Sequence, residues 1–553
     1  MRNRRWWGMA VVTVAVAMAC SSTPATPAPA TAPPASQPTK TTTPVTPPPV
    51  VTTAPGATAT APGATATAPG ATATAPAATA TAPAATPTTA ATPAAVTPAV
   101  PKTPTGYAQL DAALGSTQPF KGKAVDIQTQ WIGGEGANFT AALADFATAT
   151  GITINIEGVG SSHETVLKTR IDGGAPPDLA MLAQPSAVDA YGTAGKLVDL
   201  GTALSADEIT KLNTEHPATI SLVTDGTHIW GIPYKLDVKS TVWYPIKAFA
   251  AAGYTVPTTY DELTALEAKI VADHPDGKSN PWCIGMAAGT ATGWQATDWL
   301  EEVVLKTMGV DYYNKWITHQ VTFQDPGIKA AMDNYLAKIF FTPNYVFGGV
   351  PAIIATPQTD PMDPMFPPAS AGDNWDGFTP GCWMQKQATW YGPDFFPDVK
   401  AGAKTSQYIL GQDIGIFEFP VIDPTLGQVV EGSGDTLLIP APANGSAVRP
   451  EVLAVAEFLS TPEGTENWIR AGSAISANQT TPNDWYAGQY KLQIAANIVA
   501  TAKGFGFDAS DLMPASVGAG TEWSQLSDWI NGGGTNPSTD TVLKAIDDSW
   551  PTP

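Results

Sequence analysis

The sequence contains little cysteine and histidine and has no excess of positive charge, and each shortage excludes a class of function. Only 3 cysteines and 5 histidines occur among 553 residues, too few for the clustered thiolate and imidazole ligands of zinc and iron–sulfur sites. The formal net charge of −21 repels nucleic acids and anionic lipid surfaces, because both are negative. We therefore expect no cofactor, no metal and no nucleic-acid partner, and the charge favours an uncharged or cationic ligand.

The N-terminus has the features of an export signal rather than of a membrane span. Three arginines precede an apolar segment, residues 6–19, which is shorter than the roughly twenty residues that span a bilayer but suits a signal-peptide core. Cys20 follows in a context that resembles a bacterial lipobox. This implies that residues 1–19 are a lipoprotein signal peptide and that Cys20 is lipidated. Ordinary cleavage after the Ala-x-Ala site, with Cys20 left as a thiol, is the alternative.

Residues 20–106 are nearly all Ala, Pro and Thr, with Lys40 and Lys102 as their only charged residues, and a proline-containing heptad repeats from Ala54. Such a segment cannot bury enough apolar area to offset the entropy lost on ordering. Proline in every repeat also excludes a coiled coil. We expect a disordered tether that holds a folded domain away from a membrane.

The pattern changes near residue 120 to alternating strand and helix signals. Residues 125–131 alternate with a period of two, as a strand does. A helix capped by Asn138 and ended by Gly151 follows, and then two further strands near 152–156 and 178–182. Strands that alternate with helices predict a parallel, right-handed α/β sheet.

The ends of these strands indicate where a ligand would bind. In open parallel sheets, ligands lie outside the carboxyl ends of the strands. Trp131 and Glu135 follow the first strand and Gln184 follows the third, so we expect all three near the ligand. Glu135 would also lie at a helix N-terminus, and stabilising that helix is its alternative role. No Gly-rich nucleotide-binding motif accompanies these loops, so nucleotide binding has no support.

Several later segments resemble a known protein family. They are residues 229–244, 281–299, 380–388 and 429–439. They are similar to the extracellular solute-binding proteins of ABC importers of the maltose-binding type, and the second and third segments are similar to the branch for α-glucosides. Where that branch commonly has His-Arg-Gln, this chain has Gln385-Lys386-Gln387.

The resemblance implies the fold and its division into domains. It implies a two-lobed, periplasmic-binding-protein-like α/β fold of type II, in which each lobe is a mostly parallel sheet flanked by helices and crossing strands form the hinge. Lobe 1 is expected to contain residues 120–238 and 430–475, and lobe 2 residues 239–429 and 476–550. The resemblance also implies a disulfide between Cys283 and Cys382, since thiols in matching motifs of an exported protein are expected to pair. Two free buried cysteines are the alternative.

The resemblance and the chemistry of sugars together indicate the ligand-binding residues. Sugars present apolar C–H faces and many hydroxyls, so their sites combine aromatic rings with carboxylates, amides and lysines. The chain has 17 tryptophans. The residues expected to bind the ligand are Trp131, Glu135, Gln184, Lys235, Asp237, Trp294, Asp298, Trp383, Gln385, Gln387 and Asp435. Core packing is the alternative for each tryptophan taken alone, and turn capping is the alternative for Asp435.

These features lead to one functional hypothesis and two alternatives. The hypothesis is a non-enzymatic, monomeric, exported lipoprotein of the cell envelope that closes over an α-glucoside or related sugar. It would deliver the sugar to the permease and ATPase of an ABC importer, with Cys20 as its only membrane anchor and its folded domain extracellular or periplasmic. One alternative is an exported glycosidase with paired carboxylates. The other is a calcium-dependent adhesin that uses Asp360, Asp363, Asp373 and Asp376, whose spacing does not match an EF-hand.

Overall fold

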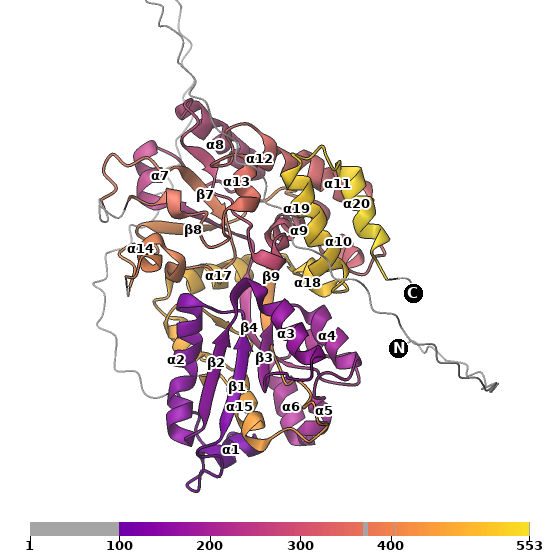
Figure 1. Ribbon diagram of the computed structural model, residues 1–553. Coiled ribbons are helices and arrows are strands. Elements are labelled where there is room, and N and C mark those ends of the chain that lie inside the picture. Colours follow the sequence, from indigo (N-terminus) through magenta and orange to yellow (C-terminus); the bar gives the residue numbers. More distant parts are fainter. Residues whose placement is uncertain (1–98, 369–373, 404, 552–553) are drawn as a thin grey trace, which may run out of the picture. The chain divides into compact units, whose positions relative to one another are not determined.

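The computed structural model describes residues 99–368, 374–403 and 405–551 (Figure 1). Cys20, the expected signal peptide and most of the expected tether lie outside these residues, as does Asp373. The described residues all belong to one compact unit of the chain. Within them, no helix combines the length and the apolar character needed to cross a bilayer.

The first of two sheets is built mainly from the N-terminal half of the described chain. Its strands, in spatial order, are β10 (Ile475–Ser476), β4 (Ile232–Val238), β9 (Val429–Leu438), β3 (Leu179–Leu182), β1 (Ala124–Thr129) and β2 (Thr153–Gly158), with β11 (Gly504–Phe507) beside β9. β1 pairs in parallel with β2 and β3, whereas β9 runs antiparallel to β3 and β4. The pairing is therefore mixed rather than mostly parallel, because β9 enters this sheet from the other direction.

Helices cover both faces of this sheet. They are α1 (Ala108–Leu114), α2 (Gly133–Thr150), α3 (His163–Asp172), α4 (Pro185–Thr193), α5 (Leu200–Ala203), α6 (Ala206–Glu215), α15 (Pro450–Ser460) and α16 (Glu463–Arg470). α2 begins at Gly133, so Asn138 lies inside the helix and is not its cap as the sequence predicts. Gly151 ends it in the left-handed conformation at φ 70°, as predicted.

The fold begins earlier than the predicted residue 120. The hydroxyl of Tyr107 donates to Glu215 at 2.9 Å, and the backbone N–H of Leu110 in α1 donates to Glu457 of α15 at 2.6 Å. Both Tyr107 and Leu110 are buried. Their apolar contacts and buried hydrogen bonds attach α1 to the sheet-covering helices.

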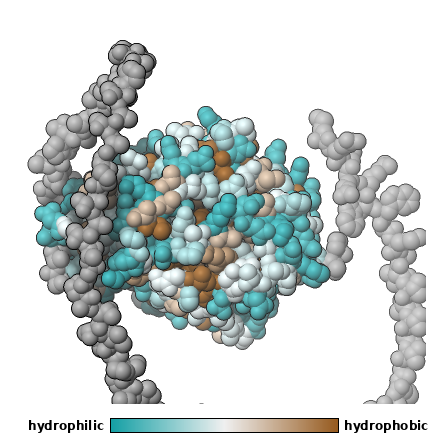
Figure 2. All heavy atoms as spheres, turned by 90° about the horizontal axis from the view of Figure 1, so that it is seen from above, coloured by the Kyte–Doolittle hydropathy of each residue, from teal (hydrophilic) through white to brown (hydrophobic). Residues whose placement is uncertain are grey.

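The second sheet is smaller and lies in the upper half of Figure 1. Its order is β6 (Asn280–Trp282), β7 (Cys382–Lys386), β5 (Thr241–Pro245) and β8 (Ile414–Glu418). Only the β6–β7 pair is parallel, so this sheet also differs from the mostly parallel sheet that was expected. Its helices are α7 (Ile246–Ala252), α8 (Tyr260–Asp273), α9 (Trp294–Met308), α10 (Val310–Ile317), α11 (Pro326–Ala331), α12 (Ala337–Phe341), α13 (Val350–Ala355), α14 (Pro397–Lys400), α18 (Ala509–Leu512), α19 (Trp523–Asn531) and α20 (Thr539–Asp548). Seen from above, this part of the surface is largely hydrophilic with scattered apolar patches (Figure 2).

Two separate large hydrophobic cores show that the fold has two lobes. The first core contains Trp468 and the second contains Trp243 and many residues of the second sheet. β9 takes part in both, because Val429 at its start packs in the second core and Leu437 near its end packs in the first. The expected two-lobed α/β fold is confirmed, and β4, β9 and the helix α17 (Tyr490–Thr501) lie where the lobes meet (Figure 1).

Candidate functional site

A cavity of about 300 Å³ lies between the lobes and is lined by residues of both. Trp131 and Gln184 reach it from the loops after β1 and β3, the carboxyl ends of strands where a ligand was expected. Lys235 of β4 and Asp435 of β9 form its floor, and Trp294 at the start of α9 reaches it from the second lobe. The expected residues that line the cavity are Trp131, Glu135, Gln184, Lys235, Asp237, Trp294 and Asp435. Their roles toward a ligand stay predictions.

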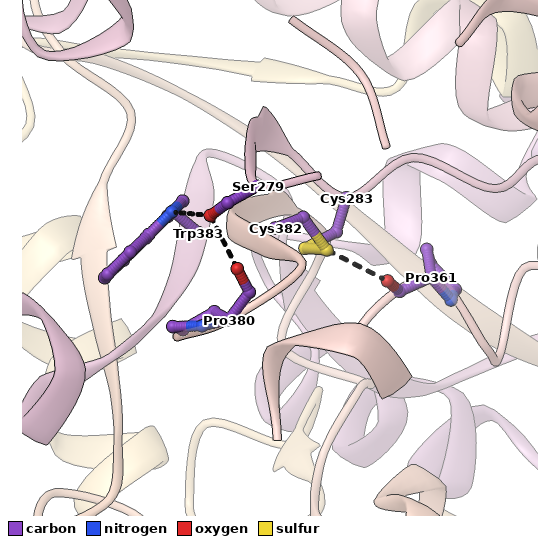
Figure 3. The surroundings of a disulfide bond; sticks show 6 residues. All are labelled: Ser279, Cys283, Pro361, Pro380, Cys382 and Trp383. Atoms are coloured by element: carbon purple, nitrogen blue, oxygen red, sulfur yellow. Dashed lines mark hydrogen bonds between the residues drawn. A yellow bond between two sulfur atoms is a disulfide. The ribbon is translucent and has the colours of Figure 1, made fainter. Parts of the chain in front are cut away.

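Trp383 does not line the cavity but packs in the core of the second lobe. Its ring lies 4.8 Å from that of Tyr254, and its indole N–H donates to the Ser279 hydroxyl at 2.7 Å (Figure 3). Only 2% of its surface is exposed. For this residue the alternative of core packing holds, and the prediction that it contacts the ligand is wrong.

Gln385 in β7 and Gln387 just after it are both buried and do not line the cavity. The carbonyl oxygen of Gln387 accepts a hydrogen bond from the indole of Trp243 at 2.8 Å. Asp298 does not line the cavity but holds Lys239, which does. None of the three reaches a ligand in this arrangement.

Cys283 and Cys382 form the expected disulfide next to Trp383 (Figure 3). It joins the end of β6 to the start of β7, two strands that already pair in parallel. The disulfide therefore fixes a wall of the second lobe and takes no direct part in the cavity.

The floor of the cavity is a buried lysine surrounded by three carboxylates. Lys235 Nζ lies 3.0 Å from Asp237 and 3.7 Å from both Glu135 and Asp435. Burial opposes the charge of Lys235, but the attraction of the three carboxylates outweighs it and raises the pKa of the lysine. Burial also raises the pKa of Glu135 to about 7 and that of Asp435 to about 6, although Lys235 opposes both shifts. The floor can thus change its charge near neutral pH.

A second buried lysine, Lys239, was missed by the sequence analysis. Its Nζ donates to Asp298 of α9 at 2.6 Å and to Asp508, the N-cap residue of α18. Asp298, Asp508 and Glu431 are close enough to one another to hold a metal ion. The lysine ammonium already occupies the space between Asp298 and Asp508, so the protein supplies the cation itself. No local pattern marks Lys239 in the sequence, because its partners are far away along the chain.

The aromatic wall of the cavity also contains an unpredicted residue. Trp390 lies in the loop after β7, and its ring centroid is 6.1 Å from that of Trp294. Both indoles line the cavity and are half-buried, so each leaves ring surface for a ligand. Trp131, in contrast, is 97% buried and packs between Phe139 and Trp468. A tryptophan shortly before Gly392 and Pro393, beyond the end of a strand, is the signal that could have identified Trp390.

Direct contacts join the lobes on two sides of the cavity. The Asn138 amide of α2 donates to Asp394 at 3.0 Å, and the Thr165 hydroxyl of α3 donates to Thr290 at 3.2 Å. A Cβ built on Gly134 would lie 2.3 Å from the Cβ of Asp394. The lobes therefore approach each other so closely at this point that only glycine fits.

The acidic loop of the adhesin alternative has a partner within the protein. Lys400 Nζ lies 2.9 Å from Asp360 and 2.6 Å from Asp363. These two carboxylates therefore form an ion-paired turn next to α14.

Comparison with known proteins shows the family to which the chain belongs. The family model for bacterial extracellular solute-binding proteins matches residues 131–466. The alpha-glucosides-binding periplasmic protein AglE of Rhizobium meliloti is 32% identical over 444 residues, which cover 78% of this chain and 88% of AglE. The osmoprotective compounds-binding protein GgtB of Synechocystis is 32% identical over 430 residues, which cover 78% of this chain and 93% of GgtB.

Solved structures show the same fold at lower identity. The bacterial solute receptor AcbH superposes with a TM-score of 0.60 at 18% identity and covers 77% of this chain and 98% of its own. The maltose/maltodextrin-binding domain MalE from Bdellovibrio bacteriovorus superposes with a TM-score of 0.56 at 15% identity and covers 77% and 98%. The chain therefore belongs to the family of bacterial extracellular solute-binding proteins, and it is a receptor for a solute rather than an enzyme.

Proposed function

We propose that this protein is the sugar-binding receptor of an ABC importer, that it binds an α-glucoside or related oligosaccharide, and that it passes the sugar unchanged to the permease. The observation that carries the proposal is the pair of half-buried indoles, Trp294 and Trp390, that faces a floor of buried carboxylates and lysines. Indole faces stack on the C–H face of a sugar, and charged side chains bind its hydroxyls. The relative AglE is an alpha-glucosides-binding protein, which supports the same class of ligand.

Binding would proceed by closure of two hinged lobes. An open form admits the sugar, and contacts made from both lobes favour the closed form. β4, β9 and α17 connect the lobes and would form the hinge. We assign residues 120–238 and 430–475 to lobe 1, and residues 239–429 and 476–550 to lobe 2.

Delivery would take place at the membrane. The proposed lipid on Cys20 and the proline-rich tether would hold a monomeric receptor close to the permease and its ATPase. The tether gives the folded part a reach on the order of 50 Å by coil statistics, enough for repeated cycles of capture and release without loss from the envelope.

The proposal is tested by calorimetry with a panel of mono- and disaccharides that includes glucose, maltose and trehalose. Changing Trp294 or Trp390 to alanine should weaken binding of the preferred sugar about 10- to 100-fold, because each change removes buried aromatic area. Trp550→Ala is the matched control, since this half-buried indole stacks on His319 and lies outside the cavity. Stoichiometric binding supports the proposal, and release of a shorter sugar or the absence of any binding contradicts it.

Closure is tested by changing Gly134 to alanine. Gly134 lies in the first turn of α2 and has no positive φ, so alanine fits the helix. Its new methyl group overlaps Asp394 only when the lobes meet. Overpacking of this kind costs about 1–3 kcal/mol, so the sugar should bind about 5- to 150-fold more weakly, measured by calorimetry. Adding Asp394→Gly, which removes the clashing Cβ, should restore much of the affinity. Equal affinity of Gly134→Ala and the unchanged protein would show that closure does not bring these residues together.

A further inference from the structure

The walls of the cavity carry many more acidic than basic groups. Six carboxylates line it, those of Glu135, Glu164, Asp237, Asp435, Asp508 and Asp511, against the two ammonium groups of Lys235 and Lys239. A cavity for a neutral polyol needs acceptors and donors but no net charge. This excess is therefore a feature that the proposed function alone does not explain.

Lys235 and Lys239 already form ion pairs and do not neutralise the remaining carboxylates of the cavity. Lys235 is shared by three of them, and Lys239 is held by Asp508 and by Asp298, which does not line the cavity. Buried charges without compensation are costly. A third buried lysine, Lys491, lies outside the lining and attracts Glu135 and Asp237. The cavity carboxylates without a lysine in ion-pair contact are those of Glu164 and Asp511, and these need a cation or a proton.

The groups without partners in the cavity are mainly hydrogen-bond acceptors. The carboxylate of Asp511, a residue only 5% exposed, accepts no hydrogen bond and forms no ion pair with another described residue, and that of Glu135, a residue 8% exposed, has only the Lys235 ammonium at 3.7 Å. Gln130, which lines the cavity, donates from its Nε2 to Asp435, and its buried Oε1 has no hydrogen-bond partner. An ammonium group supplies three donors for such acceptors together with positive charge, which a sugar hydroxyl does not carry.

We infer that the ligand carries an ammonium group, so that an amino sugar binds more tightly than the neutral sugar with a hydroxyl in place of the amine. The inference rests on the proposed function and narrows its substrate class. The amine would pair with one of the cavity carboxylates, that of Glu135, Glu164 or Asp511, and the sugar ring would lie against Trp294 and Trp390. An amine also gains from nearby indole faces.

Protons compete with such an ammonium group for the same carboxylates. The charged groups that face Glu135 are Lys235, Asp237, Asp435 and Lys491, and those that face Asp511 are Asp508, Lys239, Glu301 and Asp298. Burial raises the pKa of Glu135 to about 7 and raises the pKa values of Glu164 and Asp511. At low pH these carboxylates hold protons, which the ammonium must displace. Affinity for the amine should therefore rise from pH 5 to pH 7, while affinity for the neutral sugar should change less.

The experiment compares matched pairs by calorimetry on the full chain. The pairs are glucose against glucosamine and trehalose against trehalosamine, with N-acetylglucosamine as a substituted but neutral control. We expect at least about tenfold tighter binding of the amine at pH 7 in at least one pair. Asp511→Asn, which keeps the shape and removes one charge, should reduce this ratio. Asp484→Asn, at an exposed site outside the cavity, should leave the ratio unchanged.

The outcomes separate the inference from the proposed function. Equal or weaker binding of the amines, together with clear binding of neutral sugars, overturns the inference and leaves the proposed function standing. Binding of neither class to the folded protein overturns both. A preference for amines that does not respond to Asp511→Asn or to pH also overturns the inference, since the carboxylates would then not be its cause.

Discussion

Changing Lys239 to methionine should lower the free energy of unfolding by about 3–5 kcal/mol. The lysine is 95% buried, and its ammonium is the cation between Asp298 and Asp508. Methionine fills a similar volume without charge, so the cost comes from carboxylates left without compensation rather than from a cavity. The Glu431 side chain, whose nearest cation is Lys386 at 3.8 Å, lies beside the same pair.

The loss of stability in Lys239→Met should depend on pH, and the protonation of the buried carboxylates determines whether it grows or shrinks as the pH rises. In the unchanged protein, Lys239 outweighs the effect of burial and lowers the pKa of Asp508, so the stability from this pair is present above the unfolded pKa and is lost as the pH falls. Burial already raises the pKa of Asp298 although Lys239 opposes the shift. Without the lysine, burial would raise the pKa of Asp298 further and would also raise that of Asp508 above its unfolded value. The variant would then lose stability as the pH rises. The difference between the two proteins should therefore be larger at pH 8 than at pH 5.

Denaturant unfolding of the sugar-free protein at both pH values measures this effect. Lys278→Met is the matched control, because Lys278 forms an exposed ion pair with Asp276 at 3.4 Å and its loss should leave stability nearly unchanged. Equal stability of Lys239→Met and the control would show that the buried carboxylates are neutral in the folded protein without help from Lys239.

The parts of the site that could be predicted are those with a local or a family signal. Trp131, Glu135 and Gln184 follow strands whose carboxyl ends meet at one edge of a parallel sheet, so their place followed from the order of strands and helices. Lys235 and Asp435 lie in segments that resemble the crossing strands of the family, and the structure pairs them directly, residue against residue.

The parts that could not be predicted depend on contacts between distant segments. Trp383, Gln385 and Gln387 were assigned to the site from their motif, but β7 lies between β5 and β6 and places all three in the buried interior away from the cavity. That β7 has two neighbours is visible only once β5 and β6 are placed. Lys239 and Asp508 are 269 residues apart, and no spacing rule connects them. The mixed pairing of the first sheet could not be predicted either, because β9 runs antiparallel to β3 and β4. Its direction is set by the chain coming back from the second lobe.

Removing the disulfide should lower the free energy of unfolding by about 4–5 kcal/mol, because the bond closes a loop of 99 residues in the unfolded chain. The double change Cys283→Ala and Cys382→Ala leaves no reactive thiol at this place and avoids a mixture of oxidised and reduced forms. Its melting temperature should fall by about 5–10 °C, measured by calorimetry. A reducing agent should lower the melting temperature of the unchanged protein to a similar value and should not affect the double variant.

The sugar affinity of the double cysteine variant shows whether the disulfide acts on the unfolded chain or on the shape of the folded protein. β7 is held on one side by β6 and on the other by β5, and the backbone N–H of Cys283 donates to Met384 at 2.7 Å. These bonds remain when the sulfur atoms are removed, and neither cysteine lines the cavity. The double variant should therefore bind sugar within about twofold of the unchanged protein, a difference below about 0.4 kcal/mol. A large loss of affinity with little change in melting temperature would instead mean that the disulfide acts by holding the second lobe in its binding shape.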